Sequence, residues 1–224
     1  MNFFNELQSA TEPQRQELFS IPVIQDALQG KVVTSQYIAF LSQAYHHVKH
    51  TVPLLMACGS RLDGSREWLR EAIAEYIEEE VGHQEWILSD IKACGGDPES
   101  VRHARPHPNT ELMVAYAYHQ VDRGNPVGFF GMVHVLEGTS TALATHAADT
   151  MRSALALPPE AFTYLSSHGS LDLDHVAFFE GLMNRLDDEG DKQAVIHMAR
   201  MMYGLYGNVF RTLPRGNQLF GEAA

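Results

Sequence analysis

Two segments of the chain carry carboxylate and histidine side chains at spacings that suit metal binding. In the first, two residues separate Glu80 from His83. In the second, LSSHGSLDLDHVAFFEG at 165–181, His168, Asp172 and His175 follow the pattern H-x3-D-x2-H. A carboxylate and an imidazole three positions apart on a helix project to the same side, where they can bind one ion or a pair. Nitrogen and oxygen ligands without thiolates favour iron or manganese over structural zinc.

Glu80 falls on the apolar face of a helix that we predict over residues 65–93. Leucine, isoleucine and tyrosine side chains at helical spacing define this face, with Glu80 at its centre, His83 on its edge and Tyr76 one turn earlier. The neighbouring Glu78 and Glu79 point outward or sideways, as acidic runs usually do. A buried carboxylate is costly unless it is paired or metal-bound. Glu80 is therefore a candidate ligand, with Tyr76 a candidate neighbour.

A third carboxylate, Glu137, lies on the inward face of a helix predicted over residues 126–154, together with Phe130. The small residues that follow it would let neighbouring helices approach or leave room for a ligand. His134, one turn earlier, is a candidate partner of Glu137, although a single histidine in such a place is more often a hydrogen-bonded core residue. Glu137 completes a set of three carboxylates and three imidazoles.

The segment 165–181 is expected to form a corner between two helices, at 159–168 and 171–188. Gly169 is a plausible end for the first of them. Asp172 and His175 share an apolar face with Phe179, and His168 would reach into the core from the preceding helix end. The alternative to metal binding is electrostatic. The helix dipole would stabilise Asp172 as a carboxylate in a first turn and His168 as a cation in a last turn.

Helical periodicity dominates the rest of the chain, and strand-like alternation is nearly absent. We predict an all-α bundle in which residues 1–224 form a single domain. A kink is expected at Pro53, and residues 96–108 are expected to form the longest loop. The remaining helices are predicted at 2–19, 22–30, 34–62, 110–123 and 191–211.

Composition excludes several classes of function. The net charge of −12 leaves no basic face for nucleic acid or for an anionic membrane surface. No apolar run approaches the length of about 20 residues that a membrane span needs. Only two cysteines occur, Cys58 and Cys94, with no CxxC pair, and the first residues do not look like a signal peptide. A cytoplasmic protein is expected.

The six candidate ligands also carry a family resemblance. Their pattern of E-x2-H, a later glutamate and H-x3-D-x2-H resembles that of the heme-oxygenase-like di-iron oxidases, which include the decarboxylase that makes 1-undecene and the chlamydial CADD protein. The stretch FLSQAYHHVKHT is similar to an early helix of that family and of its relatives, the TenA thiaminases and pyrroloquinoline-quinone synthases. CADD has a glutamate seven residues before the histidine, where this chain has Tyr76.

The resemblance implies a heme-oxygenase-like (TenA/PqqC-like) helical bundle around two iron ions, with manganese as an alternative and O2 as co-substrate. It implies oxidation of a small organic substrate, a fatty acid or an amino-acid-like compound, by decarboxylation, hydroxylation or N-oxygenation. An electron donor and a homodimer are compatible with it.

Other assignments stay open at this stage. One is a cofactorless enzyme on the same scaffold, and another is a non-catalytic metal-binding or regulatory protein. A thiaminase is disfavoured, because no cysteine lies near HVLEG. His46 is a candidate pocket residue, with Phe130 and Phe179 as apolar lining. No cationic partner for a substrate carboxylate stands out, and Lys49 and Arg152 are only candidates.

Overall fold

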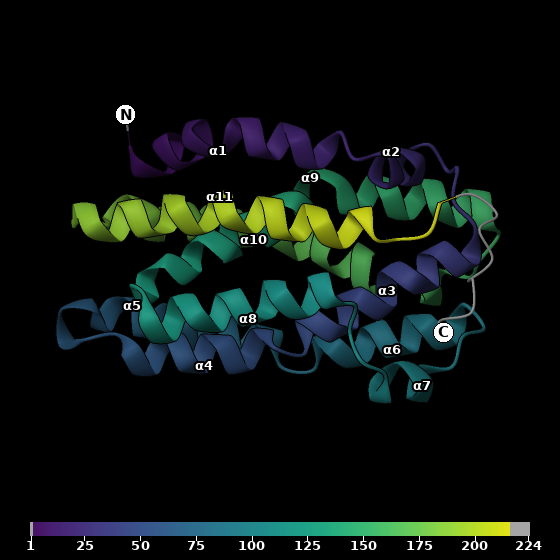
Figure 1. Ribbon diagram of the computed structural model, residues 1–224, viewed down its shortest axis with the longest axis horizontal. Helices are drawn as coiled ribbons and strands as arrows, with labels where there is room; N and C mark the ends of the chain where they lie inside the picture. The colour runs from purple at the N-terminus through teal and green to yellow at the C-terminus, as the bar shows by residue number, and fades with distance from the viewer. Residues whose placement is uncertain (1, 216–224) are drawn as a thin grey trace.

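The protein is an assembly of helices, with no strand in the part of the chain that the structure describes (Figure 1). The structure is a computed structural model that describes residues 2–215, and side chains for all of these except 168–175. The all-α prediction is confirmed. The α-helices are α1 (Phe3–Phe19), α2 (Pro22–Leu28), α3 (Thr34–Val48), α4 (Thr51–Arg61), α5 (Glu67–Glu80), α6 (His83–Ala93), α7 (Pro98–His103), α8 (Pro108–Arg123), α9 (Phe130–Leu155), α10 (Thr163–Arg185) and α11 (Glu189–Arg211), joined in places by the short 3-10 helices η1 (Gly64–Arg66), η2 (Pro126–Phe129) and η3 (Pro159–Ala161).

The helix predicted over residues 34–62 is interrupted in its middle, between α3 and α4. The interruption falls at Lys49 and His50, one turn before Pro53. Proline has no N–H to donate and its ring clashes with the carbonyl four residues earlier, which here belongs to Lys49. The expected kink at Pro53 is therefore a complete break, displaced by one turn toward the N-terminus.

The helix predicted over residues 65–93 is also two helices, α5 and α6. Val81 is extended, and Gly82 has φ +96°, a conformation that costs little only for glycine. The acidic run that ends α5 faces the negative end of the helix dipole, which disfavours continuing the helix. Glu80 and His83 consequently lie on opposite sides of a turn, and the predicted single helix is wrong.

At α10 the prediction is wrong in the opposite sense, because the two helices predicted at 159–168 and 171–188 form one continuous helix. It runs without interruption from Thr163 to Arg185, through Gly169. The predicted corner is therefore absent, and residues 168, 172 and 175 stand at positions i, i+4 and i+7 of one helix, a spacing that places them on one face. The predicted 96–108 loop similarly contains α7.

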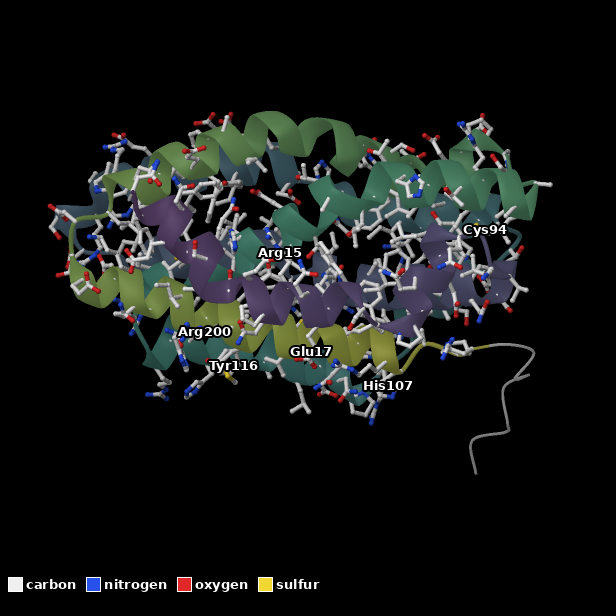
Figure 2. The ribbon with its side chains drawn as sticks, turned by 90° about the horizontal axis from the view of Figure 1, so that it is seen from above. Arg15, Glu17, Cys94, His107, Tyr116 and Arg200 are labelled. Atoms are coloured by element: carbon white, nitrogen blue, oxygen red, sulfur yellow. The ribbon has the colours of Figure 1, made fainter. Side chains whose placement is uncertain are left out.

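The helices pack along one long axis (Figure 1), with α1 beside α11 and α10 against both α9 and α6. Their side chains fill the space between them (Figure 2). A Cβ added at Gly131 of α9 would lie 2.4 Å from the Val195 carbonyl of α11, so this glycine permits the close approach of the two helices. No helix within residues 2–215 has both the length and the apolar character needed to cross a membrane.

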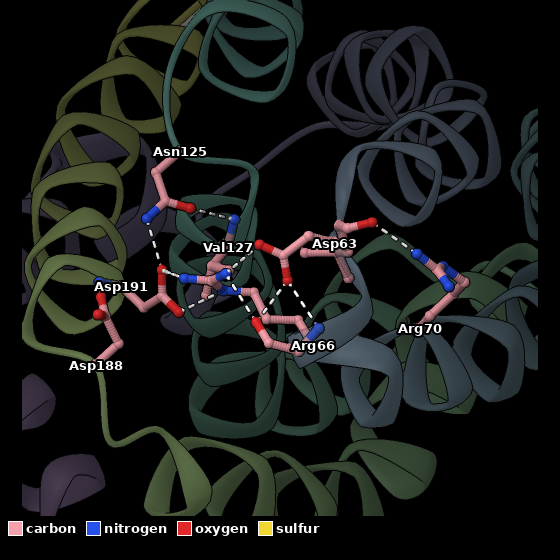
Figure 3. Close-up of polar contacts among 9 residues, drawn as sticks. Asp63, Arg66, Arg70, Asn125, Val127, Asp188 and Asp191 are labelled. Atoms are coloured by element: carbon pink, nitrogen blue, oxygen red, sulfur yellow. Dashed lines mark hydrogen bonds and ion pairs between the residues drawn. The ribbon is translucent and has the colours of Figure 1, made fainter.

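An ion pair that is buried on its Asp191 side connects elements at one end of the bundle. Asp191, in the first turn of α11, accepts two hydrogen bonds from Arg66, at 2.7 Å from Nε and 3.0 Å from Nη2 (Figure 3). Asn125 donates a third to the same carboxylate at 2.7 Å, and Asp63 binds the remaining edge of the guanidinium. This network connects the start of α5, which carries Glu80 at its other end, to α11 and to the loop before α9.

Candidate functional site

Two candidate ligands from different helices line one pocket. Glu80 comes from the last turn of α5 and Glu137 from the middle of α9, and between them lies a pocket of about 720 Å³, part of it open to solvent. We call it the carboxylate pocket. Both α3 and α4 contribute to it, since His47 and Thr51 flank the break between these two helices. The other lining residues are Val48, Leu54, Leu55, Tyr76, Phe129, Met132, Val133, Leu136, Tyr164 and Tyr206.

His83 contacts the carboxylate pocket through Glu80. Its Nδ1 lies 3.1 Å from Oε2 of Glu80, and the two side chains are only 4% and 14% exposed. The His83 ring also lies against Trp86, with ring centroids 4.0 Å apart. The turn at Gly82 therefore preserves the contact that a continuous helix was expected to give, and Glu80 has a buried imidazole beside it.

Tyr76 adds a proton donor to the acidic side of the pocket. Its side chain is almost fully buried, and its pKa is raised well above the ordinary value by burial and by the charges of Glu137, Glu79 and Glu80. The hydroxyl therefore stays protonated at physiological pH. A buried, protonated phenol beside carboxylates can donate a hydrogen bond to an oxygen atom in the pocket.

The histidine of the early helix that lines the pocket is His47 rather than His46. His47 packs edge-on against Tyr206, with ring centroids 5.8 Å apart. His46 is buried beside Lys49, at 3.2 Å from Nδ1 to Nζ, and burial together with the Lys49 charge lowers its pKa to about 4. His47 and Thr51 flank the break between α3 and α4, so their spacing in the sequence does not by itself identify this face.

The remaining predicted residues fall into three places. His134 and Phe179 line a second pocket on the other side of Glu137, and Phe130 is part of the fully buried core. The side chains of His168, Asp172 and His175 lie outside the described residues, so their role as ligands stays a prediction. Their helix packs against the two helices that carry Glu137 and His83. The described residues alone hold no cluster of three or more metal-binding side chains.

An apolar pocket of about 820 Å³ adjoins the carboxylate pocket. The two share Tyr164 and Tyr206, so these tyrosines form the boundary between them. Aliphatic and aromatic side chains of α2, α3, α9 and α11 form most of its wall. The arrangement joins a polar end with two carboxylates to a larger apolar space, which suits a ligand with an apolar body.

Neither cysteine is placed to act as a nucleophile in these pockets. The Cys58 thiol is buried and donates to the Pro126 carbonyl at 3.3 Å, and burial raises its pKa to about 12. Burial and Asp90 raise the pKa of Cys94 to about 11. Nucleophilic cysteines need a lowered pKa, so the arrangement does not suit cysteine catalysis.

Comparison with solved structures identifies the fold class as heme-oxygenase-like. A domain of unknown function with this fold from Shewanella denitrificans OS217 is 23% identical, with a TM-score of 0.83 and coverage of 95% of this chain and 92% of that chain. A TenA homologue from P. horikoshii OT3 is 13% identical, with a TM-score of 0.75 and coverage of 95% and 98%. A CADD-like protein of unknown function from Nostoc punctiforme PCC 73102 is 18% identical, with a TM-score of 0.72 and coverage of 93% and 96%.

The sequence itself identifies the family. Residues 38–207 match the family of proteins described as iron-containing redox enzymes. The chain belongs to this heme-oxygenase-like family, as the sequence pattern indicated. No curated protein matches the chain.

Proposed function

We propose that this protein is a non-heme di-iron oxidase that uses O2 to oxidise a small, largely apolar organic substrate. The observation that carries the proposal is the position of Glu80 and Glu137, which come from different helices and line one pocket in a chain of an iron-containing family. Glu80, His83 and Glu137 would hold iron together with His168, Asp172 and His175 of α10. Two carboxylate–imidazole pairs and a further carboxylate form a ligand set suited to two such ions.

The described donors fit a ferrous ion in type and in burial. Glu80 is 14% exposed and His83 is 4% exposed, and a second carboxylate lies across the pocket. Two carboxylates held together away from water repel each other, and a divalent cation between them removes that cost. Oxygen and imidazole donors suit iron and manganese. Iron bound there would supply the electrons for reducing O2, which protein side chains do not readily provide.

The chain's own residues would bind and orient the substrate. Tyr76, protonated and buried, can donate a hydrogen bond to a substrate or ligand oxygen beside the carboxylates. The apolar pocket beyond Tyr164 and Tyr206 would take the apolar part of the substrate, and its side chains would exclude water from the reacting group. Decarboxylation, hydroxylation and N-oxygenation are all compatible with this placement.

Anaerobic titration with Fe(II) tests the proposal. We expect about two irons per chain, a ratio taken from the known di-metal bundles, and loss of most of the binding in Glu80→Gln and Glu137→Gln. Glu79→Gln is the matched control, because Glu79 adjoins Glu80 in sequence but is exposed; it should bind iron as the unmodified protein does. Absence of iron uptake by the folded protein, or unchanged uptake in both pocket variants, would refute the proposal. Activity that persists in a chelator would indicate a cofactorless enzyme instead.

A further inference from the structure

A second pocket reaches Glu137 from the opposite side. It lies between α1, α9, α10 and α11, encloses about 630 Å³ including its open part, and is lined by Arg15 together with His134, Phe179 and Tyr203. Glu137 lines both this pocket and the carboxylate pocket. We propose that this second pocket, the α1 pocket, binds the carboxylate of an organic acid through Arg15. The inference rests on the proposed function and assigns the residue and the pocket that would bind the carboxylate of its substrate.

Arg15 is positioned as an anion partner. It lies on the side of α1 toward α9, whereas Glu17 lies toward α11 (Figure 2). One Nη of Arg15 is paired with Glu12, one turn earlier, and Glu12 also accepts a hydrogen bond from Gln16 at 2.6 Å. The guanidinium has five N–H groups, and within the described residues no other acceptor is recorded for it. Its side chain is 32% exposed, so a carboxylate can reach the unused edge.

Aromatic rings form the apolar part of the α1 pocket. His134 is stacked on Phe179, with centroids 5.8 Å apart and an interplanar angle of 23°. Phe4 and Tyr203 meet the same imidazole edge-on, each at 6.3 Å. Burial and the Arg15 charge lower the pKa of His134 to about 4, so the ring is neutral at physiological pH. Among the described residues, Arg15 is therefore the cation that lines this pocket.

Open space lies beside Gly138, the residue after Glu137. Among the described residues, no atom lies within 4 Å of a Cβ added at Gly138. With its carboxylate on Arg15 and its body between the aromatic rings, an acid would extend toward Glu137. The carboxylates of Glu12 and Glu137 oppose an anion here, and the proposed iron would neutralise the second of them. The ligand is thus a carboxylic acid whose carbons next to the carboxylate are apolar or aryl, and whose remaining apolar part would extend past Glu137 toward the apolar pocket.

Calorimetric binding of phenylacetate and its neutral analogue phenylacetamide tests this inference. Both are titrated into the full-length protein as isolated and after anaerobic saturation with Fe(II). We expect phenylacetate to bind about ten-fold more tightly than phenylacetamide in at least one of the two states, the typical strength of a charge-assisted hydrogen bond at a partly exposed site. Arg15→Gln should abolish this preference without changing iron uptake.

Two further variants separate anion binding from a structural role of α1. Arg211→Gln is the matched control, because Arg211 pairs with Glu17 on the other side of α1 at 2.7 Å; it should keep the full preference. Glu12→Gln removes the competing carboxylate and should strengthen phenylacetate binding. If the Arg15–Glu12 pair had only a structural role, Arg15→Gln and Glu12→Gln would both weaken phenylacetate binding. Equal binding of acid and amide, no binding of either, or equal losses in Arg15→Gln and Arg211→Gln would overturn the inference. Iron uptake is measured independently of phenylacetate binding. If the carboxylate-binding inference fails, the iron titration still decides the di-iron proposal.

Discussion

Replacing Asp191 by Asn should destabilise the fold strongly, because it breaks an ion pair that is buried at one partner. Asp191 is 3% exposed, and its two oxygens bind Arg66 at 2.7 and 3.0 Å. An amide in the same place directs an NH2 group at a guanidinium or at Asn125. Breaking a fully buried pair costs about 3–5 kcal/mol. Because Arg66 is 25% exposed, water can partly solvate it, and we expect about 3 kcal/mol.

The assay is thermal and urea unfolding against a matched surface pair. Arg102 and Glu85 form the same two-pronged contact, at 2.9 and 2.8 Å, but they are 33% and 50% exposed. Glu85→Gln should therefore cost less than about 1 kcal/mol. For a protein of this size, about 3 kcal/mol corresponds to a fall in Tm of roughly 6–12 °C. Similar losses in Asp191→Asn and Glu85→Gln would show that burial does not decide the strength of these pairs.

Two further predictions concern Gly82 and His134. Gly82→Ala should lower the free energy of unfolding by about 1–2 kcal/mol, measured with denaturant, because φ at this residue is +96°. Gly204 lies in the exposed middle of α11, where a new Cβ would meet no described atom, so Gly204→Ala should stabilise the fold. Equal effects of the two substitutions would contradict this prediction. His134 takes a proton near pH 6.5 when unfolded and near 4 when folded, so stability should fall by roughly 3 kcal/mol across that interval as pH decreases. His134→Phe should flatten the pH dependence of the free energy of unfolding, leaving only contributions from other groups such as His46. An unchanged slope would refute the assignment of this pH dependence to His134.

Local pattern was sufficient for most of the fold. Helical periodicity identified α1, α8 and α11 to within two residues, because a helix that buries one face must repeat apolar residues every three or four positions. Pro53 signalled an interruption for an equally local reason. The sequence also indicated an iron-binding family, since the types and spacing of the candidate ligands are visible without any tertiary contact.

The phase of helices across an interruption is not a local property. The turn at Gly82 and the continuity of α10 through Gly169 depend on what each segment packs against, and a glycine permits either outcome. Which face of α3 meets the pocket, the one with His47 and not His46, likewise depends on the helices that α3 packs against. A helical wheel drawn through such a point has no fixed phase beyond it, although His83 still meets Glu80 across the turn at Gly82.

The sequence by itself determined the helical class and the family. Only the tertiary structure decided which distant residues meet. It placed Glu80 and Glu137 in one pocket, and it brought Arg15, which sequence reasoning missed, to the other side of Glu137. The physical reason is that periodicity records how much of each helix is buried, whereas the choice of neighbour follows from packing between surfaces far apart in the chain.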